Sequence, residues 1–334
     1  MNINAIDIET NPCIKKFYIL GTIIELKVYG KSAEKSINEA IKKLCEIDDK
    51  MSVFKDFSEV SIINRNAGIS DCEVSDDTYF VINKAAEYSQ LSGGAFEPTI
   101  RPIVNLWGVN TDHAKIPKLD EIKTDMRLIS YKDIILNDKV KSIKLRNKNQ
   151  AMDLGAIAKG FAADKVKEIL IKNNIKNAII DLGGNIYALG SKPNGTPWNI
   201  GIQDPIKKCG EYVGIVSVQN KSIVTSGNYE RFFMKEGKRY HHIIDPRTGA
   251  PSENGIISAT VISSNSIDGD ALTTCIYIMG IENGLKLIET IKDVEAIFIM
   301  NDKKIHTTSG IKDMFKLTNK DYIYRNSIST IGAC

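Results

Sequence analysis

DLGAIAKGFAADKVKEILIKNNIKNAIIDLGGNIYAL, residues 153–189, holds the clearest structural pattern in the chain. Apolar side chains recur every three or four positions over 157–172, which predicts an amphipathic helix. Residues 178–189 then read as strand, Gly183-Gly184 turn and strand. A helix followed directly by a strand–turn–strand unit predicts antiparallel strands beside a packed helix.

The same mixture extends to both sides of this stretch. Upstream, we expect one strand over 17–29, with Gly21-Thr22 inside it, and helices over 31–51 and 76–91. Downstream, we expect a second hairpin, in which 212–218 pairs with 222–225. The other expected elements are short strands around Ile134 and Ile143, strands over 240–244 and 256–263, and helices over 270–279 and 285–291. Hairpins mixed with helices favour the α+β class over a doubly wound fold.

Composition excludes several classes of protein. Of the 334 residues, 43% are hydrophobic and 25% are charged, which is ordinary for a globular protein and argues against wholesale disorder. A formal net charge of +3 gives no indication of a nucleic-acid partner. Because no Pro-rich linker interrupts the chain, we expect one body over 15–320, a loose segment at 1–14 and a tail at 321–334.

The sequence shows no membrane or export signal. No apolar run approaches the roughly 18 residues of a membrane-spanning helix, so we expect no integral membrane segment. The N-terminus lacks the basic start and apolar segment of a signal peptide. If Met1 is the natural start we expect a cytoplasmic protein; a trimmed start would allow export or a membrane anchor. None of the six cysteines forms a C-x-x-C pair, which argues against a zinc ribbon or iron–sulfur cluster.

Residues 155–160, GAIAKG, have only part of a phosphate-loop pattern. Phe161 and Ala162 follow the second glycine, where a P-loop requires Lys and Ser or Thr. A helix that begins near Ala156 would still present free N–H groups to an anion, with Lys159 adding positive charge. The alternative is an ordinary helix start capped by Asp153.

Asp270 and Thr274 are four residues apart on an expected helix and therefore share a face. A carboxylate and a hydroxyl placed in this way suit a hard cation such as Mg²⁺. A cation near a helix N-terminus opposes the helix dipole, an objection that a bound pyrophosphate would remove. The alternative is that Asp270 caps the helix and Thr274 bonds to the backbone.

The histidine pair His241-His242 ends a strand just before a charged turn. Strand alternation sends the two imidazoles to opposite faces, so that one can face a site while the other meets solvent. The alternative is a histidine with a structural hydrogen bond. The tryptophans, Trp107 and Trp198, either stack on a planar ligand or fill the core.

Taken in order, these segments resemble the ApbE-type FAD:protein FMN transferase family, over roughly residues 17–320. The resemblance rests on an ordered series of motifs, not on any one of them. The series comprises Leu20-Gly-Thr22, Ser52-Val-Phe54 with Ser58-Glu59 and Asn64, Gly94-Ala-Phe-Glu-Pro-Thr99 with Pro102, Asn105-Leu-Trp-Gly108, Asp153-Leu-Gly-Ala-Ile-Ala-Lys159-Gly-Phe-Ala-Ala-Asp164, Leu182-Gly-Gly184, Thr225-Ser-Gly-Asn-Tyr-Glu-Arg231, His242-Ile-Ile-Asp-Pro-Arg-Thr-Gly249 and Asp270-Ala-Leu-Thr-Thr274.

The resemblance implies a fold and a reaction. The fold has two T-fold-like α+β halves with mixed or antiparallel sheets and packed helices, and FAD binds between them. FAD is the substrate and Mg²⁺ the cofactor. The pyrophosphate of FAD is cleaved, the FMN moiety passes through its phosphate to a Thr or Ser hydroxyl of an acceptor protein with a flavinylation-type motif, and AMP leaves.

The resemblance also assigns roles to residues. It places Asp270, Thr274 and the backbone carbonyl of Ala156 at the metal, and His242 at a position critical for activity. His242 or Asp270 would then deprotonate the incoming hydroxyl. The positions that match FAD contacts are Leu20, Phe54, Ala95, Phe96, Glu97, Asp153, Lys159 and the backbone of Ile244.

Three of these positions depart from the family pattern. Leu20 replaces Met, Glu97 replaces Asp, and Phe54 replaces a Tyr, so that the ring can stack but cannot donate a hydrogen bond. Two other functions remain open on the sequence. One is an FAD pyrophosphatase that releases FMN and AMP to water, and the other is a flavin-binding protein without turnover.

Overall fold

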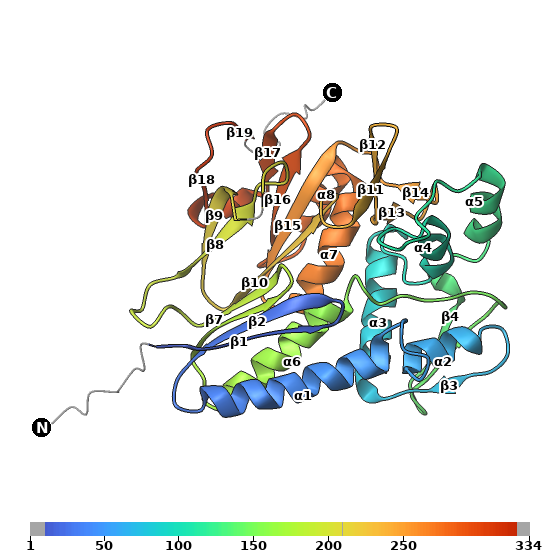
Figure 1. The fold of residues 1–334 in the computed structure, drawn as a ribbon, viewed down its shortest axis with the longest axis horizontal. Coiled ribbons are helices and arrows are strands. Elements are labelled where there is room, and N and C mark those ends of the chain that lie inside the picture. Colours follow the sequence, from blue (N-terminus) through green and yellow to red (C-terminus); the bar gives the residue numbers. More distant parts are fainter. Residues whose placement is uncertain (1–10, 209, 326–334) are drawn as a thin grey trace, which may run out of the picture.

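The structure is a computed structural model and describes residues 11–208 and 210–325. A large, mostly antiparallel sheet runs through the molecule (Figure 1). All neighbouring strands pair antiparallel except the last two, which are parallel. In spatial order the strands are β1 (Cys13–Ile19), β2 (Thr22–Tyr29), β6 (Asn177–Leu182), β7 (Asn185–Leu189), β10 (Lys221–Gly227), β15 (Ile256–Ser263), β16 (Glu295–Met300), β17 (Lys304–Thr307) and β19 (Ile323–Arg325).

Some of the helices cover one face of this sheet and others lie beside it, and the described residues also form four smaller sheets (Figure 1). The helices are α1 (Ala33–Met51), α2 (Glu59–Arg65), α3 (Asp76–Leu91), α4 (Arg101–Trp107), α5 (Leu119–Met126), α6 (Ala158–Lys172), α7 (Ser266–Met279) and α8 (Ile281–Glu289). The smaller sheets are β18 (Phe315–Leu317), β9 (Tyr212–Val218) and β8 (Trp198–Gln203); β3 (Cys72–Glu73), β5 (Ser142–Leu145) and β4 (Ile134–Asn137); β11 (Phe232–Lys235) and β12 (Lys238–His241); and β13 (Ile244–Asp245) and β14 (Ala250–Pro251).

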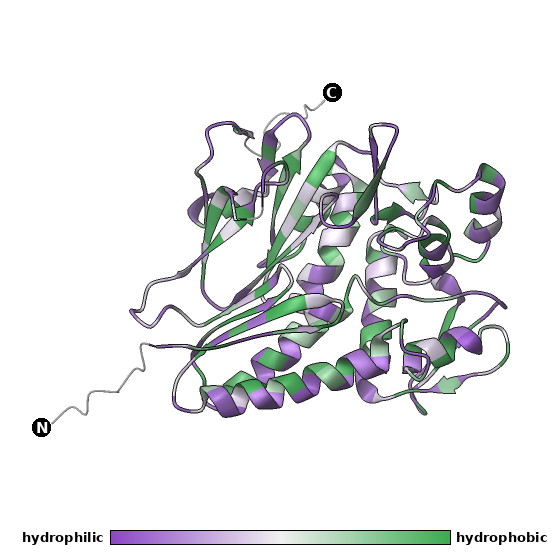
Figure 2. Ribbon diagram, viewed as in Figure 1, coloured by the Kyte–Doolittle hydropathy of each residue, from purple (hydrophilic) through white to green (hydrophobic). Residues whose placement is uncertain are grey.

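The core has two layers because side chains alternate across the large sheet. On one face, Val261 and Phe298 pack with α1, α3, α6 and α7. On the other face, the neighbouring Ile262 and Ile297 pack against the small sheet of β8, β9 and β18. Figure 2 shows the matching pattern on α1, where hydrophobic and hydrophilic residues alternate along the helix. The mixed α+β class expected from the sequence is confirmed.

Several expected elements are confirmed, including α3, the β6–β7 hairpin and both tryptophans as core residues. The single strand expected over 17–29 is wrong, because the chain reverses there. Leu20 and Gly21 form the turn between β1 and β2, with φ angles of 54° and 70°. This backbone region is the one that two-residue hairpin turns require.

The expected hairpin of 212–218 with 222–225 is also wrong. β9 pairs with β8 and β18, whereas β10 pairs with β7 and β15, so the turn at 219–220 carries the chain between two sheets. The helix expected from Asp270 begins earlier, at Ser266. Its first N–H groups are bound by a carboxylate from another helix, which local sequence does not reveal.

The chain ends hold more structure than expected. β1 begins at Cys13, inside the segment expected to be loose, and β19 lies within the expected tail. The rest of both segments, 1–10 and 326–334, lies outside the described residues, and the limits of the 15–320 body stay a prediction. In the described part of the chain, no helix is both long and apolar enough to cross a bilayer.

Candidate active site

The site is built where the first turns of α6 and α7 cross. Gly160 of α6 lies so close to α7 that a Cβ atom there would meet the Ser266 carbonyl oxygen at 2.3 Å and the Asp270 Cβ at 2.7 Å. Only glycine permits this approach of the two backbones. The contact brings the buried Asp270 to the N-terminus of α6.

The Asp270 carboxylate binds two groups of this turn. The Gly160 N–H donates to Asp270 Oδ2 at 2.8 Å. The Lys159 ammonium lies 3.5 Å from Asp270 Oδ1 and donates to the Gly155 carbonyl oxygen at 2.9 Å. The capping role proposed for Asp270 on its own helix is therefore replaced by a cap on a different helix.

The oxygen atoms around Lys159 fit a hard cation. Within the described residues, no hydrogen bond ends on the Ala156 carbonyl oxygen and none involves the Thr274 hydroxyl. The Lys159 ammonium already lies beside Asp270 and offsets part of its negative charge, so a cation would be favoured there only together with an anionic ligand such as phosphate. No cluster of three or more His, Cys, Asp or Glu side chains occurs among residues 11–208 and 210–325. One carboxylate with neutral oxygens is nevertheless a donor set that Mg²⁺ accepts when water and phosphate complete its shell.

His242 is a neutral base close enough to Lys159 for the lysine charge to act on it. Its Nδ1 lies 3.2 Å from the Arg231 carbonyl oxygen, which can only accept, so Nδ1 carries the hydrogen and Nε2 keeps a lone pair. Burial lowers the pKa of His242 to about 4, and the positive charges of Arg231 and Lys159 act in the same direction. His242 is half-buried and uncharged at neutral pH.

His241 points into the protein instead of into solvent. It is buried, its Nε2 lies 3.1 Å from the Ser252 carbonyl oxygen, and its ring packs edge-on against Tyr277. Burial lowers the pKa of His241. Of the two imidazoles, His241 therefore has the structural role and His242 faces the site.

The β1–β2 turn forms a neighbouring wall. The Arg231 Nη2 donates to the Gly21 carbonyl oxygen at 3.3 Å, and the Arg231 carbonyl contacts His242, which follows β12, so Arg231 joins the turn containing Leu20 to His242. Thr22 packs against Gly183 so closely that a Cβ at Gly183 would lie 2.0 Å from the Thr22 hydroxyl. Two motifs 160 residues apart thus meet at one corner of the site.

Phe54, Arg101 and Asp153 form a chain of contacts that leads to the segment before α6. The Phe54 ring is 81% exposed, and the Arg101 guanidinium lies 4.9 Å from its centroid. Arg101 also pairs with Asp153 at 2.8 Å, and Asp153 accepts the Gly155 N–H at 2.8 Å. An exposed ring held by a cation is suited to stack on a planar ligand.

The segment Ala95–Glu97 reaches the same region through its backbone. The side chains of Ala95 and Phe96 are buried. Glu97 accepts hydrogen bonds from the Thr99 N–H and the Tyr131 N–H, and burial raises its pKa. Next to it, the Pro98 carbonyl accepts the Asp153 N–H at 2.8 Å. Only backbone atoms of this segment remain for a ligand.

Ile244 also has only its backbone to offer, because its side chain is buried beside Trp107. The Trp107 Nε1 donates to the Gly249 carbonyl oxygen at 2.8 Å, and its ring stacks on Tyr240. Trp107 is therefore a core residue that supports the strands around His242.

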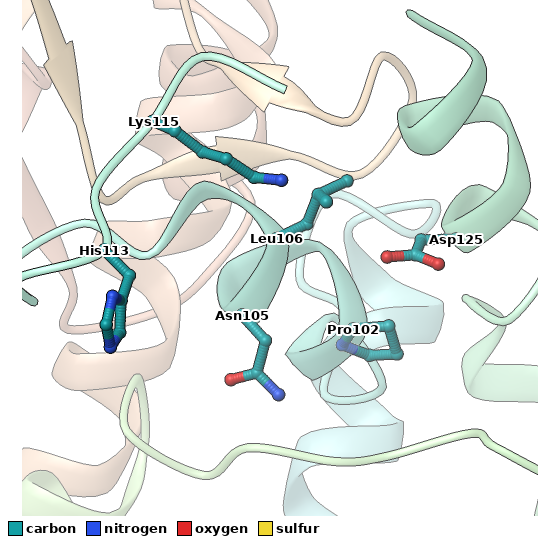
Figure 3. A pocket seen from close by; sticks show the side chains of 6 residues that line it. All are labelled: Pro102, Asn105, Leu106, His113, Lys115 and Asp125. Atoms are coloured by element: carbon teal, nitrogen blue, oxygen red, sulfur yellow. The ribbon is translucent and has the colours of Figure 1, made fainter. Parts of the chain in front are cut away.

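A surface hollow of about 680 Å³ lies elsewhere, between α4 and α5 (Figure 3). Its lining residues are Pro102, Asn105, Leu106, His113, Lys115 and Asp125. None of the residues predicted for the site lines it, and the hollow is wide open to solvent.

The sequence analysis missed three residues that build the site. Arg101 and Arg231 hold Phe54 and the Leu20 turn, and Asp164 caps α7. Asp164 had a signal, since it closes the motif that begins at Asp153 and lies one turn after Gly160. Arg231 closes the motif that begins at Thr225, but its partner Gly21 is 210 residues away, and Arg101 had no signal because Phe54 is 47 residues away.

A lysine, a helix start and a buried carboxylate near a neutral histidine make a site of the kind that can accommodate a phosphate group. Comparison with known proteins agrees: the sequence profile of the ApbE family matches residues 20–298, and the chain belongs to this family.

Individual relatives cover nearly the whole chain. It is 33% identical over 322 residues to an FAD:protein FMN transferase of Treponema pallidum, with 91% of this chain and 89% of that protein covered. An FAD:protein FMN transferase of Klebsiella pneumoniae is also 33% identical, with 91% and 94% covered. Among solved structures, the ApbE protein of Thermotoga maritima superimposes with a TM-score of 0.85 at 28% identity, covering 91% of this chain and 99% of that one.

Proposed function

We propose that this protein transfers the FMN moiety of FAD to a Thr or Ser hydroxyl of an acceptor protein and releases AMP. The names of its relatives support the reaction. The observation that carries the assignment to a site is the contact of Lys159 and Asp270 at the start of α6, with the neutral His242 alongside.

The start of α6 is the place proposed for the pyrophosphate of FAD. Lys159 supplies a positive charge there, and the helix start favours an anion. When the phosphate arrives, it competes with Asp270 for the Lys159 ammonium, since 3.5 Å is a loose ion pair. Positioning and charge neutralisation provide most of the catalysis in phosphoryl transfer.

Asp270, Thr274 and the Ala156 carbonyl would hold Mg²⁺ in this proposal. When bound, Mg²⁺ would neutralise charge on the phosphate oxygens. Asp270 would contribute the single carboxylate, and its bond to the Gly160 N–H would fix which oxygen faces the cation. The water and phosphate ligands that Mg²⁺ prefers would complete the coordination.

His242 is the better candidate for the base that takes the hydroxyl proton. Its Nε2 has a free lone pair, whereas both oxygens of Asp270 already face donors. The acceptor oxygen would form a bond to the FMN phosphorus as the bond to the AMP oxygen breaks, and the proton would pass to Nε2. The anionic pyrophosphate would raise the pKa of His242 from its low value and so improve it as a base.

The remaining predicted residues would hold the flavin and the rest of FAD. Phe54 would stack on a ring of FAD, and Asp153, which pairs with Arg101, would contact FAD as well. Leu20 would contribute from the β1–β2 turn. Ala95, Phe96, Glu97 and Ile244 would contribute backbone groups.

The test is a transfer assay with purified protein, FAD, Mg²⁺ and a small domain that carries a flavinylation-type Asp-Gly-x-Thr-Ser/Thr segment. A fluorescent acceptor band on a denaturing gel, absent with EDTA or with the acceptor Thr replaced by Ala, is the expected result. A dark band with AMP and free FMN in solution would instead identify an FAD pyrophosphatase. A dark band with intact FAD, where a known transferase labels the same domain, would identify a flavin-binding protein.

A further inference from the structure

Asp164 is a buried carboxylate that is not among the residues predicted for the site. Both of its oxygen atoms have hydrogen-bond or ion-pair partners. It accepts the Ser266 N–H at 3.0 Å through Oδ1 and the Ile267 N–H at 2.9 Å through Oδ2. The Lys167 ammonium lies 2.9 Å from Oδ1 and balances its charge. Both N–H groups belong to the first turn of α7, where free donors need acceptors.

The helix that carries Asp270 thus depends on α6 for its N-terminal cap. Asn265, the residue before α7, makes no capping hydrogen bond with its side chain. A carboxylate has two acceptor oxygens, so Asp164 can bind the two adjacent N–H donors at once, one with each oxygen. Asparagine would turn an NH₂ group toward one of the donors, and serine would leave one donor without an acceptor.

The cap acts on the cation-binding face of α7. Ser266 lies one turn before Asp270 and two turns before Thr274, so these residues share one side of the helix. Gly160 holds the same turn of α7 against α6, which fixes the separation of the helices. At that separation, the two Asp164 hydrogen bonds fix the position of α7 along its own axis, and its rotation about that axis, relative to α6.

We propose that Asp164 is a positioning residue for the cation site, which sets the placement of Asp270 and Thr274 through the first turn of α7. The proposal rests on the proposed function, since it presumes that these two residues bind a divalent cation. Partners behind metal ligands contribute to metal affinity even though they do not touch the ion.

The test compares Asp164→Asn and Asp164→Ser with Asp204→Asn. Asp204 is a matched control because it is also buried and accepts hydrogen bonds from the Tyr322 hydroxyl and the Asn319 side chain, which belong to neither α6 nor α7. Mn²⁺ binding is measured from the EPR signal of the free ion with and without FAD, corrected with an FAD blank. The Mg²⁺ concentration for half-maximal transfer and the melting temperature are measured on the same samples.

We expect both Asp164 variants to raise the Mn²⁺ dissociation constant and the half-saturating Mg²⁺ concentration by about tenfold or more. Saturating Mg²⁺ should restore most of kcat. Asp204→Asn should lower the melting temperature and leave both cation values unchanged. Serine keeps one acceptor, so it serves as the second variant if the asparagine protein does not fold.

Unchanged cation affinity in the Asp164 variants, with affinity lost in Asp270→Asn, would overturn the positioning role and leave the proposed function standing. A wild-type protein without an Asp270-dependent Mn²⁺ site would overturn the metal assignment and this inference together, while the gel assay would still judge FMN transfer separately.

Discussion

Asp164 and Asp270 each accept backbone hydrogen bonds from the first turn of the other's helix. Asp270 on α7 binds the Gly160 N–H of α6, and Asp164 on α6 binds the Ser266 and Ile267 N–H groups of α7. The two caps lock the helix starts together. The candidate site is therefore held by a reciprocal exchange between two helices, not by one loop.

Replacement of Asp270 by Ala should remove the only carboxylate proposed for the cation. We expect Mg²⁺-dependent transfer to fall roughly 100-fold or more, because charge neutralisation at the phosphate is lost. The measurement is the initial rate of acceptor labelling over a range of Mg²⁺ concentrations. Full activity would exclude Asp270 as a ligand.

Lys159→Met should change both the affinity for FAD and the pKa of His242. Loss of the ammonium should weaken FAD binding, measured by flavin fluorescence titration, because the helix start loses its positive charge. It should also raise the pKa of His242, since the Lys159 charge contributes to the lowered value. NMR titration of the histidine ring protons measures that second effect, and a pKa that does not move would contradict the proximity of the two side chains.

His242→Ala should slow transfer by about 100-fold or more while FAD binding stays largely intact, as expected for loss of a general base. In the free wild-type protein, the His242 ring should stay neutral when the pH falls below 6.5, the ordinary pKa of histidine, and should take up a proton only near pH 4. Unfolded chains would bind a proton between these values, so this group favours folding less as the pH falls through that window. Ring-proton shifts that titrate near pH 6.5 would refute the neutral state.

Gly160→Ala should destabilise the protein by about 1–3 kcal/mol, because the added methyl group meets the backbone of α7. Gly269→Ala in α7 is the matched control: its methyl group would meet only the side chains of Ser263 and Val224, and alanine favours the helix by about 1 kcal/mol. Denaturant unfolding measures both. Equal changes in the free energy of unfolding for the two variants would show that the contact of Gly160 with α7 is not closer than other packing contacts.

Leu20→Gly separates backbone strain from ligand contact. Glycine should relieve the positive φ of 54° and stabilise the β1–β2 turn by up to about 1 kcal/mol. If Leu20 touches FAD, the dissociation constant of FAD should rise at the same time. Lys303→Gly relieves a similar φ of 63° in the turn between β16 and β17 and should leave FAD affinity unchanged.

Local motifs predicted most of the site's residues, because each motif keeps its residues at fixed spacing. Lys159 and Gly160 follow Asp153 in one motif, and Asp270 and Thr274 are one turn apart in another. The sequence did not predict what joins these motifs. Arg231 binds Gly21 across 210 residues, and Asp164 binds Ser266 across 102. Gly21, Asp164 and Arg231 stand in motifs, but no motif indicates which distant residue each one binds.

The two fold errors have different origins. The strand expected over 17–29 has β-forming residues on both sides of Gly21, and this single glycine was interpreted as part of the strand, although Leu20 and Gly21 both have positive φ and form the turn. Residues 212–218 and 221–227 are neighbouring strands with a short connection, yet each finds better partners in a different sheet. In the first case a local turn was missed, and in the second case tertiary pairing overrides the local pattern.

The order of strands in the large sheet determines when the site can form during protein synthesis. β2 can pair with β6 only after β6 has been synthesised, about 150 residues later. The Gly160 N–H at the start of α6 can bind Asp270 only after Asp270 has been synthesised. A ribosome must therefore translate the chain at least as far as Asp270 before Lys159 can meet its carboxylate partner. Until β6 has been made, the edge of β2 that will pair with it stays open in the nascent chain, and such an edge can pair with another chain.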